Sequence, residues 1–276
     1  MTHMTRLRMM SFQLDRREFV ATCASLIALP STLLALTAEE ANQDRDLEKI
    51  LREIPNSRPN IDRMKLLCDQ YASIFPVPLV LPAKIQAIES GYNPDAVSNS
   101  YAVGGAQFVH NTARELGAHL PNVDEFKQQD DVLVLRRRSQ AKMDEAIAAF
   151  RKGEDRQAAD FRTEAKEMTS KYEKLHERTM ADFKKRMFAM STDARRTYDG
   201  RFDPATSDDM LVHYLATLAR TVKKEFDLID DAHILLLAGV AFNAGPGNVK
   251  RKPGIPTVAQ NVEYANKLML FQKAKF

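Results

Sequence analysis

The stretch Ile85–Gly117, IQAIESGYNPDAVSNSYAVGGAQFVHNTARELG, carries more information than any other part of this chain. It places one glutamate, Glu89, at the end of an apolar segment with helical spacing, directly before Ser90-Gly91. A turn-rich loop follows, then a Gly-Gly-Ala-Gln step and the start of another helix. A carboxyl group at a helix C-terminus among apolar neighbours is harder to ionise, because both the helix dipole and burial disfavour the negative charge. Glu89 is therefore the first candidate for a group that donates a proton near neutral pH.

A second block far downstream, AFNAGPGNV at Ala241–Val249, completes the pattern, and a strongly apolar segment that predicts a buried helix leads into it. The two blocks together resemble the catalytic core of the soluble lytic transglycosylases, lysozyme-like enzymes that cleave the glycan strands of peptidoglycan. The first block matches the family pattern E-S-G-[FY]-x-P-x-A-x-S from Glu89 to Ser98. The second matches A-[YF]-N-A-G-P-G from Ala241 to Gly247.

The resemblance implies a mainly α, lysozyme-like domain that cleaves the β-1,4 bond between N-acetylmuramic acid (MurNAc) and N-acetylglucosamine (GlcNAc). It implies a 1,6-anhydro-MurNAc product and a single catalytic residue, for which Glu89 matches the family acid and base. Four further positions match residues that bind substrate or brace the cleft: Ser98, Gln107, Asn243 and Tyr264, the last with a hydroxyl that would reach the glutamate. The resemblance implies no cofactor, and the six histidines lack ligand spacing such as H-E-x-x-H, so no metal site is predicted.

The chain departs from the family pattern at several positions. The next stretch of the family pattern is G-A-x-G-L-M-Q-L-M-P-x-T-A, which Ala102, Gly104, Gln107, Thr112 and Ala113 fit. The chain departs from it with Tyr101 for Gly, Gly105 for Leu, Ala106 for Met and His110 for Pro. The closing element P-x-x-E-T-x-x-Y is altered too, with Gln260-Asn261 in place of Glu-Thr. We expect these changes to alter the shape of the cleft wall and the subsite preference more than the chemistry.

A second carboxylate is hard to find near Glu89 in the sequence. Most glycosidases use two carboxyl groups, about 5 to 9 Å apart, and Asp95 is the one candidate close by. Because Asp95 follows Pro94 in a predicted turn, capping that turn is its simpler role. Two alternatives remain beside the transglycosylase. One is a hydrolytic muramidase in which Asp95 or another carboxylate holds water, and the other is a catalytically weak wall-binding scaffold for an envelope-spanning machine.

The segment from Asp131 to Met190 lies outside the resemblance. It is charged, nearly free of Gly and Pro, and its apolar residues step by three or four in a row close to a coiled-coil heptad. The predicted contact row is Leu135, Met143, Ile147, Phe150, Phe161, Ala165, Met168, Tyr172, Leu175, Thr179, Phe183, Met187 and Met190. Gly153 is the predicted break between two long antiparallel helices. The charged faces are most simply solvated, and the sharper interpretation is a docking surface at 131–190 for an envelope or secretion-machine protein, or for anionic wall polymers.

The expected organisation starts with an export signal or N-terminal anchor at 1–38. There Arg16-Arg17 resembles a twin-arginine motif and an apolar run over 19–38 follows, long enough to anchor in a membrane. A linker over 39–60 comes next, with one short helix at Asp46 to Glu53. The catalytic domain is expected at 61–124 and 198–276, interrupted by the inserted hairpin at 125–197. These features predict a protein exported to the periplasm or cell envelope.

Composition narrows the remaining classes. The net charge is +3, of which +2 falls on residues 1–38, so the rest of the chain lacks the strong positive field of a nucleic-acid-binding protein. The two cysteines, Cys23 and Cys68, do not make a disulfide framework. The predicted partner is peptidoglycan, with no nucleic acid.

Overall fold

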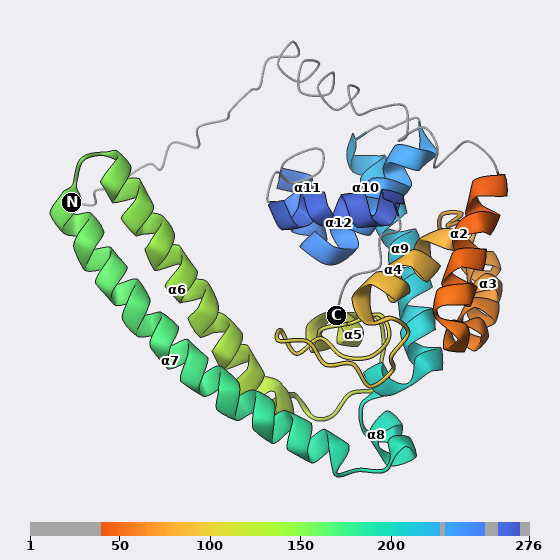
Figure 1. Cartoon of the computed structure of the whole chain (residues 1–276), viewed down its shortest axis with the longest axis horizontal. Helices are drawn as coiled ribbons and strands as arrows, with labels where there is room; N and C mark the ends of the chain where they lie inside the picture. Colours follow the sequence, from red (N-terminus) through yellow and green to blue (C-terminus); the bar gives the residue numbers. More distant parts are fainter. Residues whose placement is uncertain (1–39, 227–229, 252–258, 271–276) are drawn as a thin grey trace, which may run out of the picture.

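Helices make up nearly all of the regular structure in the residues that the computed structural model describes, namely 40–226, 230–251 and 259–270 (Figure 1). The α-helices are α2 (Glu40–Glu53), α3 (Arg58–Tyr71), α4 (Val80–Ser90), α5 (His110–Glu115), α6 (Lys127–Arg151), α7 (Asp155–Phe188), α8 (Thr192–Tyr198), α9 (Pro204–Phe226), α10 (Asp231–Ala244), α11 (Pro246–Arg251) and α12 (Ala259–Leu270). Three 3-10 turns join them: η2 (Pro55–Ser57), η3 (Val123–Phe126) and η4 (Gly200–Phe202). The predicted mainly α, lysozyme-like class with an inserted helical hairpin is confirmed. The predicted export signal at 1–38 lies outside the described residues, and none of the described helices is long and apolar enough to cross a membrane.

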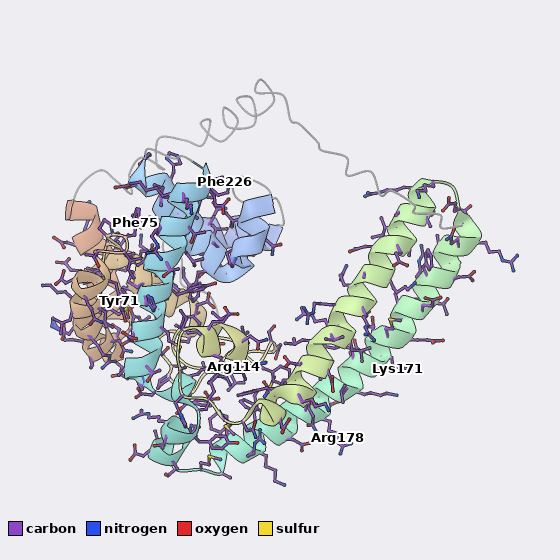
Figure 2. The ribbon with its side chains drawn as sticks, turned by 180° about the vertical axis from the view of Figure 1, so that it is seen from behind. Tyr71, Phe75, Arg114, Lys171, Arg178 and Phe226 are labelled. Carbon is purple, nitrogen blue, oxygen red and sulfur yellow. The ribbon has the colours of Figure 1, made fainter. Side chains whose placement is uncertain are left out.

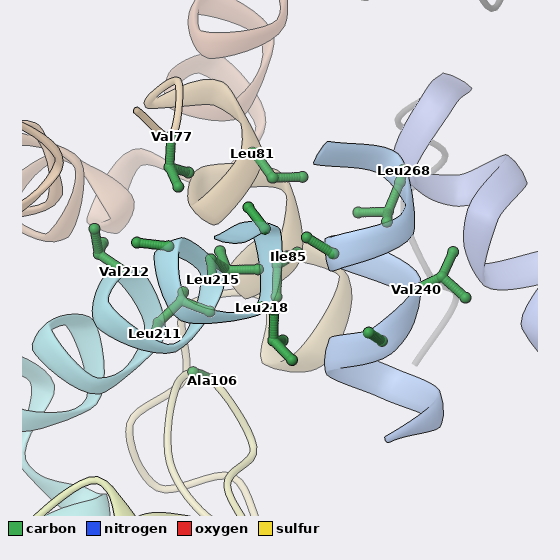
Figure 3. Close-up of a cluster of buried hydrophobic side chains, with 14 of the residues drawn as sticks. Val77, Leu81, Ile85, Ala106, Leu211, Val212, Leu215, Leu218, Val240 and Leu268 are labelled. Carbon is green, nitrogen blue, oxygen red and sulfur yellow. The ribbon is translucent and has the colours of Figure 1, made fainter. Parts of the chain in front are cut away.

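The core of the body lies where α4, α9 and α10 meet (Figure 3). The α9 helix is amphipathic, and its apolar stripe, which includes Leu211, Leu215 and Leu218, is buried against the other two. The α10 helix is apolar almost all round, the pattern of a fully enclosed helix. Gly239 on α10 lets α12 pack closely, because a Cβ there would lie 2.7 Å from a methyl carbon of Leu268. The core therefore fixes α4, the helix that carries Glu89, from several sides.

The segment predicted as a linker, 39–60, is part of this body where the structure describes it. The α2 helix is longer than the short helix expected at Asp46 to Glu53, and its Ile50 is fully buried in the core. Asp46 of α2 forms an ion pair with Lys84 of α4, whose side chain is only 3% exposed. A buried ammonium group needs such a partner, so α2 completes the packing of α4 and the linker interpretation was wrong for 40–60.

The described loop between α4 and α5 has no β-strand, and two isolated bridges, Val97 with Val103 and Val103 with Phe108, fold it back on itself. A buried ion pair between Asp199 and Arg201 braces the loop from behind. The Arg201 guanidinium also donates to the carbonyl oxygens of Tyr101 and Phe108, both at 3.2 Å. Gly104 permits this approach, because a Cβ there would lie 1.9 Å from the carbonyl oxygen of Arg201. Arg201 thus holds the loop that carries the predicted substrate residues Ser98 and Gln107.

Two long antiparallel helices, α6 and α7, form the predicted hairpin and project from the body (Figure 1). The turn falls at the predicted break, where Gly153 has φ +78°. The α7 helix alone has 34 residues, which corresponds to a length of about 50 Å. Side chains surround both helices along this length, with Lys171 and Arg178 among those of α7 (Figure 2).

The predicted contact row of the hairpin is right only in part. Ala165, Thr179, Phe183 and Met187 are buried as expected. Three expected members are exposed: Ile147 at 44%, Phe150 at 62% and Leu175 at 37%. Small side chains that were not predicted also fill the row: Ser139, Ala146, Ala149 and Ala158. Small residues let two helix backbones approach closely, and a pattern built on large apolar residues does not detect them.

Two of the departures from the family motif hold the base of the hairpin. Tyr101 is 1% exposed, and its ring packs edge-on against Phe183 while its hydroxyl lies 3.2 Å from His176 Nδ1. His110 stacks on Phe126 at the base of α6, with ring centroids 4.4 Å apart. Tyr101 adopts φ +60°, a backbone conformation that glycine takes easily and tyrosine rarely does. The hairpin contacts therefore account for a bulky side chain at a position where the family has glycine.

Candidate active site

Glu89 occupies the last turn of α4 and stands apart from the rest of that helix. Every residue of α4 is buried except Glu89, which is half-buried. The helix ends directly after it because Gly91 takes the left-handed conformation, with φ +61°, of a helix cap. Ser90 then donates a hydrogen bond of 2.6 Å to the carbonyl oxygen of Gly105 and ties the helix end to the loop. The Ser-Gly pair after Glu89 thus fixes the direction in which the carboxyl group points.

Tyr264 on α12 is the direct partner of that carboxyl group. Its buried hydroxyl donates a hydrogen bond of 2.8 Å to Glu89 Oε1. The two residues are 175 positions apart in the chain, and the contact joins the two blocks of the motif. The other carboxyl oxygen, Oε2, is left available to hold a proton.

Burial raises the pKa of Glu89 to about 7 from its ordinary value of 4.5. The hydrogen bond from Tyr264 and the positive charge of Lys267 both act in the opposite direction, and burial outweighs them. A carboxyl group with this pKa is protonated in a large share of molecules at neutral pH and can also accept the proton back. The pKa of Tyr264 is raised as well, by burial and by the neighbouring carboxyl group, so its hydroxyl remains a donor.

A cleft of about 500 Å³ opens in front of Glu89. Its walls come from the α4–α5 loop, α5, α9 and the C-terminal end of α10. Ser98, Gln107 and Asn243, three residues predicted to bind substrate, line it together with Glu89. A larger hollow of about 670 Å³ is lined by the 91–94 turn and by residues of 53–60, but Glu89 is not part of its lining. The smaller cleft, which contains Glu89, is therefore the candidate active site.

The hydrogen bonds of Ser98 and Gln107 show which of their atoms remain free for a ligand. Ser98 Oγ accepts from the backbone N–H groups of Ser100 and Ala102, so its own proton is available to donate. Gln107 Nε2 donates to the carbonyl oxygens of Ala96 and Gly104, at 3.2 and 2.8 Å. The Gln107 amide oxygen has no hydrogen-bond partner within the described part of the chain. These two residues brace the loop and present one donor and one acceptor to the cleft.

Asn243 lies at the end of α10 and is exposed, and within the described residues its amide forms no hydrogen bond. Beside it the cleft has an aromatic wall of Phe108, Tyr214 and Phe242, with ring centroids 5.5 to 6.2 Å apart. Aromatic faces pack well against the apolar faces of sugar rings. The wall therefore suits a saccharide between the amide and the carboxyl group.

Several residues of this site had no clear signal in the sequence. Tyr214 falls in the apolar stripe of α9 and looks like a core residue, yet it lines the cleft. Lys267, near Glu89, looks like an ordinary surface charge on α12. Ser100 also lines the cleft, and its place two positions after Ser98 is the sequence feature that could have indicated this. Such assignments depend on contacts between segments far apart in the chain.

Asp95, the alternative second carboxylate, is occupied elsewhere. Arg195 of α8 donates to Asp95 Oδ1 at 2.7 Å, and the buried Arg195 places its guanidinium group over the rings of Phe188 and Phe202. Asp95 is not among the residues that line the cleft. Glu89 is the single carboxyl group in the lining that the structure describes. Nor is there, in the described ranges, a group of three or more His, Cys, Asp or Glu side chains placed to hold a metal ion.

Comparison with protein families agrees with the motif. The family model of the transglycosylase SLT domain matches residues 67–133, a segment that contains Glu89, Ser98 and Gln107. The match ends before Asn243 and Tyr264. Comparisons with curated proteins and with solved structures found no match. The resemblance drawn from the sequence is confirmed by this match.

Proposed function

We propose that this chain, which carries a transglycosylase SLT domain, cleaves the β-1,4 bond between MurNAc and GlcNAc in peptidoglycan and leaves a 1,6-anhydro-MurNAc end. The domain itself points to transglycosylase action on peptidoglycan. The finer assignment rests on one observation: among the described residues that line the cleft, Glu89 is the one carboxyl group, and its pKa is raised to about 7.

The proposed reaction uses Glu89 twice. Its protonated carboxyl group donates a proton to the bridging oxygen while the bond from that oxygen to C1 of MurNAc breaks, so GlcNAc leaves with a hydroxyl group. The Glu89 carboxylate then takes the proton of the 6-hydroxyl of the same MurNAc. The freed oxygen forms a new bond to C1 and closes the anhydro ring. Glu89 ends protonated as it began, and no water is consumed.

The neighbours of Glu89 suit a carboxyl group that is first protonated, then charged and then protonated again. Tyr264 donates to Oε1 and stabilises the carboxylate that exists between the two proton transfers. The free hydroxyl proton of Ser98 and the amides of Gln107 and Asn243 can hold the N-acetyl and hydroxyl groups of the sugars. A hydrolase would need a second carboxylate to activate water, and Asp95 is engaged by Arg195. This pairing favours the transglycosylase over the muramidase.

Location and partners follow from the substrate. Because peptidoglycan lies in the cell envelope, we propose that the protein acts in the periplasm or cell envelope, which agrees with the predicted leader at 1–38. The hairpin at 131–190 stays a predicted docking surface for an envelope or secretion-machine protein. Its exposed Phe150 and Ile147, near the turn at Gly153, are the side chains that such a partner would cover first.

The test of this proposal is the release of soluble fragments from purified peptidoglycan. We expect wild type to release fragments and Glu89→Gln, which keeps the size of the side chain, to lose at least about a hundredfold in rate. Glu173→Gln, at an exposed glutamate of α7, is the matched control and should retain full activity. If wild type releases no fragments, or if Glu89→Gln and Glu173→Gln have the same rate, the proposal is wrong. Either result would favour the wall-binding scaffold.

A further inference from the structure

The hairpin reaches the edge of the cleft through one side chain. Arg136, two turns into α6, donates from Nη1 to the hydroxyl oxygen of Ser100 at 3.5 Å. Ser100 lines the same cleft as Glu89. Arg136 is exposed, so its guanidinium group lies at the rim and can be approached from solvent. A residue outside the family motif thus stands next to the proposed substrate.

Arg136 carries a charge that no neighbour neutralises. Within the described ranges, no carboxylate lies close enough to Arg136 for an ion pair. This contrasts with Lys142 on the same helix, which pairs with both Glu145 and Glu164. Burial lowers the pKa of His176, which stacks on Tyr172, and the positive charges of Arg136 and Lys184 lower it further. The base of the hairpin therefore presents positive charge next to the cleft.

The chemistry of the proposed substrate supplies a matching group. The sugar rings and N-acetyl groups of the glycan strand are uncharged. Negative charge enters through the lactyl ether on MurNAc, either as its own carboxylate or as the carboxylates of the peptide attached to it. A guanidinium group pairs with a carboxylate through two parallel hydrogen bonds, and its five donors leave one for Ser100.

We propose that Arg136 is a specificity residue that binds a carboxylate of the MurNAc substituent while the strand lies in the cleft. This inference rests on the proposed function, because it takes the glycan strand as the ligand. On this proposal the base of the hairpin helps to select the substrate. This role is independent of any partner protein that binds near the turn at Gly153. The residue holds the strand and takes no part in proton transfer.

Binding to a catalytically inactive protein tests this inference without relying on turnover. The Glu89→Gln full chain is titrated with three probes: peptide-bearing glycan fragments, fragments from which an amidase has removed the peptide, and GlcNAc oligomers without any carboxylate. Adding Arg136→Gln should weaken binding of the first probe about threefold to fivefold, the range of an exposed ion pair, and leave the GlcNAc oligomers unchanged. The second probe separates the sources, since loss there too would assign the lactyl carboxylate.

Arg138→Gln is the matched control. Arg138 belongs to the same arginine triplet, but two residues further along a helix of about 3.6 residues per turn it points to another side of α6. It should leave the affinity for all three probes unchanged. Equal effects of the two variants, or equal loss for charged and uncharged probes with Arg136→Gln, would overturn the inference alone. Absence of binding to every probe would overturn the proposed function as well.

Discussion

If the proposed reaction is right, the surroundings of Glu89 set the pH range of activity. The proposed reaction starts from protonated Glu89, and burial raises the pKa of this carboxyl group to about 7. We therefore expect kcat/KM to be highest below neutral pH and to fall as pH rises through about 7, by about tenfold for each further unit. Rates on soluble glycan fragments, measured between about pH 5 and about pH 9, check this. A rate that stays constant across neutrality would contradict the assignment of Glu89 as the acid.

Tyr264→Phe tests the partner of that carboxyl group. Removing the hydroxyl removes a hydrogen bond that lowers the pKa of Glu89, so the pKa should rise further. The alkaline limb of the rate profile then moves to higher pH, while the maximal rate falls because the carboxylate loses its donor. The opposite movement of the limb, toward lower pH, would mean that Tyr264 does not act through this bond. Tyr71→Phe, at a hydroxyl that bonds Asp209 away from the cleft, controls for general effects.

The hairpin helices α6 and α7 depend on the loop residue Tyr101 for their attachment. Tyr101→Gly restores the family residue and relieves the unfavourable backbone conformation, but it removes a buried ring from between Phe183 and His176. We expect a net loss of about 2 to 4 kcal/mol in the free energy of unfolding, because losing a buried aromatic side chain outweighs the backbone relief.

Tyr101→Phe keeps the ring and loses only the contact with His176, so it should cost about 1 kcal/mol. Urea unfolding of both variants beside wild type checks the pair. If Tyr101→Gly is as stable as wild type, the ring is not what holds the hairpin to the body.

The elements differ in how much of them the sequence predicts. The α4 helix ends where the sequence predicts, at the Ser90-Gly91 step, because Gly91 takes the left-handed conformation that caps a helix. The α8 and α11 helices were not predicted, since each is about two turns long and depends on its neighbours. Ser98, Gln107 and Asn243 of the motif line one cleft with Glu89. Tyr214 lines it too, although its spacing in the sequence is that of a core residue of α9.

Charges in the sequence do not show whether they are buried. Asp199 and Arg201 are two positions apart and look solvated, yet they form an ion pair with 1% and 0% of their side chains exposed. The sequence shows that Tyr101 and His110 depart from the motif, but it does not show why. The explanation is their contacts in the fold, of Tyr101 with Phe183 and of His110 with Phe126. Local spacing predicts helices well and predicts contacts between helices poorly.

The molecule as a whole is a helical body that contains the candidate site, with one projecting arm formed by α6 and α7 (Figure 1). The base of the arm packs on the loop of the cleft, while the outer part consists of α6 and α7 packed on each other. Replacing residues 143–164 by a short glycine-rich turn should therefore leave activity on soluble fragments within about twofold, because the removed part is far from the site. The same change should abolish any role that depends on a partner at the tip.

Release of fragments and growth of the host, each measured with the shortened protein, separate these two roles. A large loss of activity on soluble fragments would contradict the division of the molecule into a body that does the chemistry and an arm that does not. Full function in the host would remove the reason to look for a partner at Phe150 and Ile147.

The most direct test of the central claim is the chemical identity of the new glycan ends. Purified peptidoglycan is digested with wild type and with Glu89→Gln, and the soluble products are identified by mass spectrometry. We predict 1,6-anhydro-MurNAc ends from wild type and none from the variant. Reducing MurNAc ends from wild type would show that water attacks C1, and would contradict the use of one carboxyl group for both proton transfers.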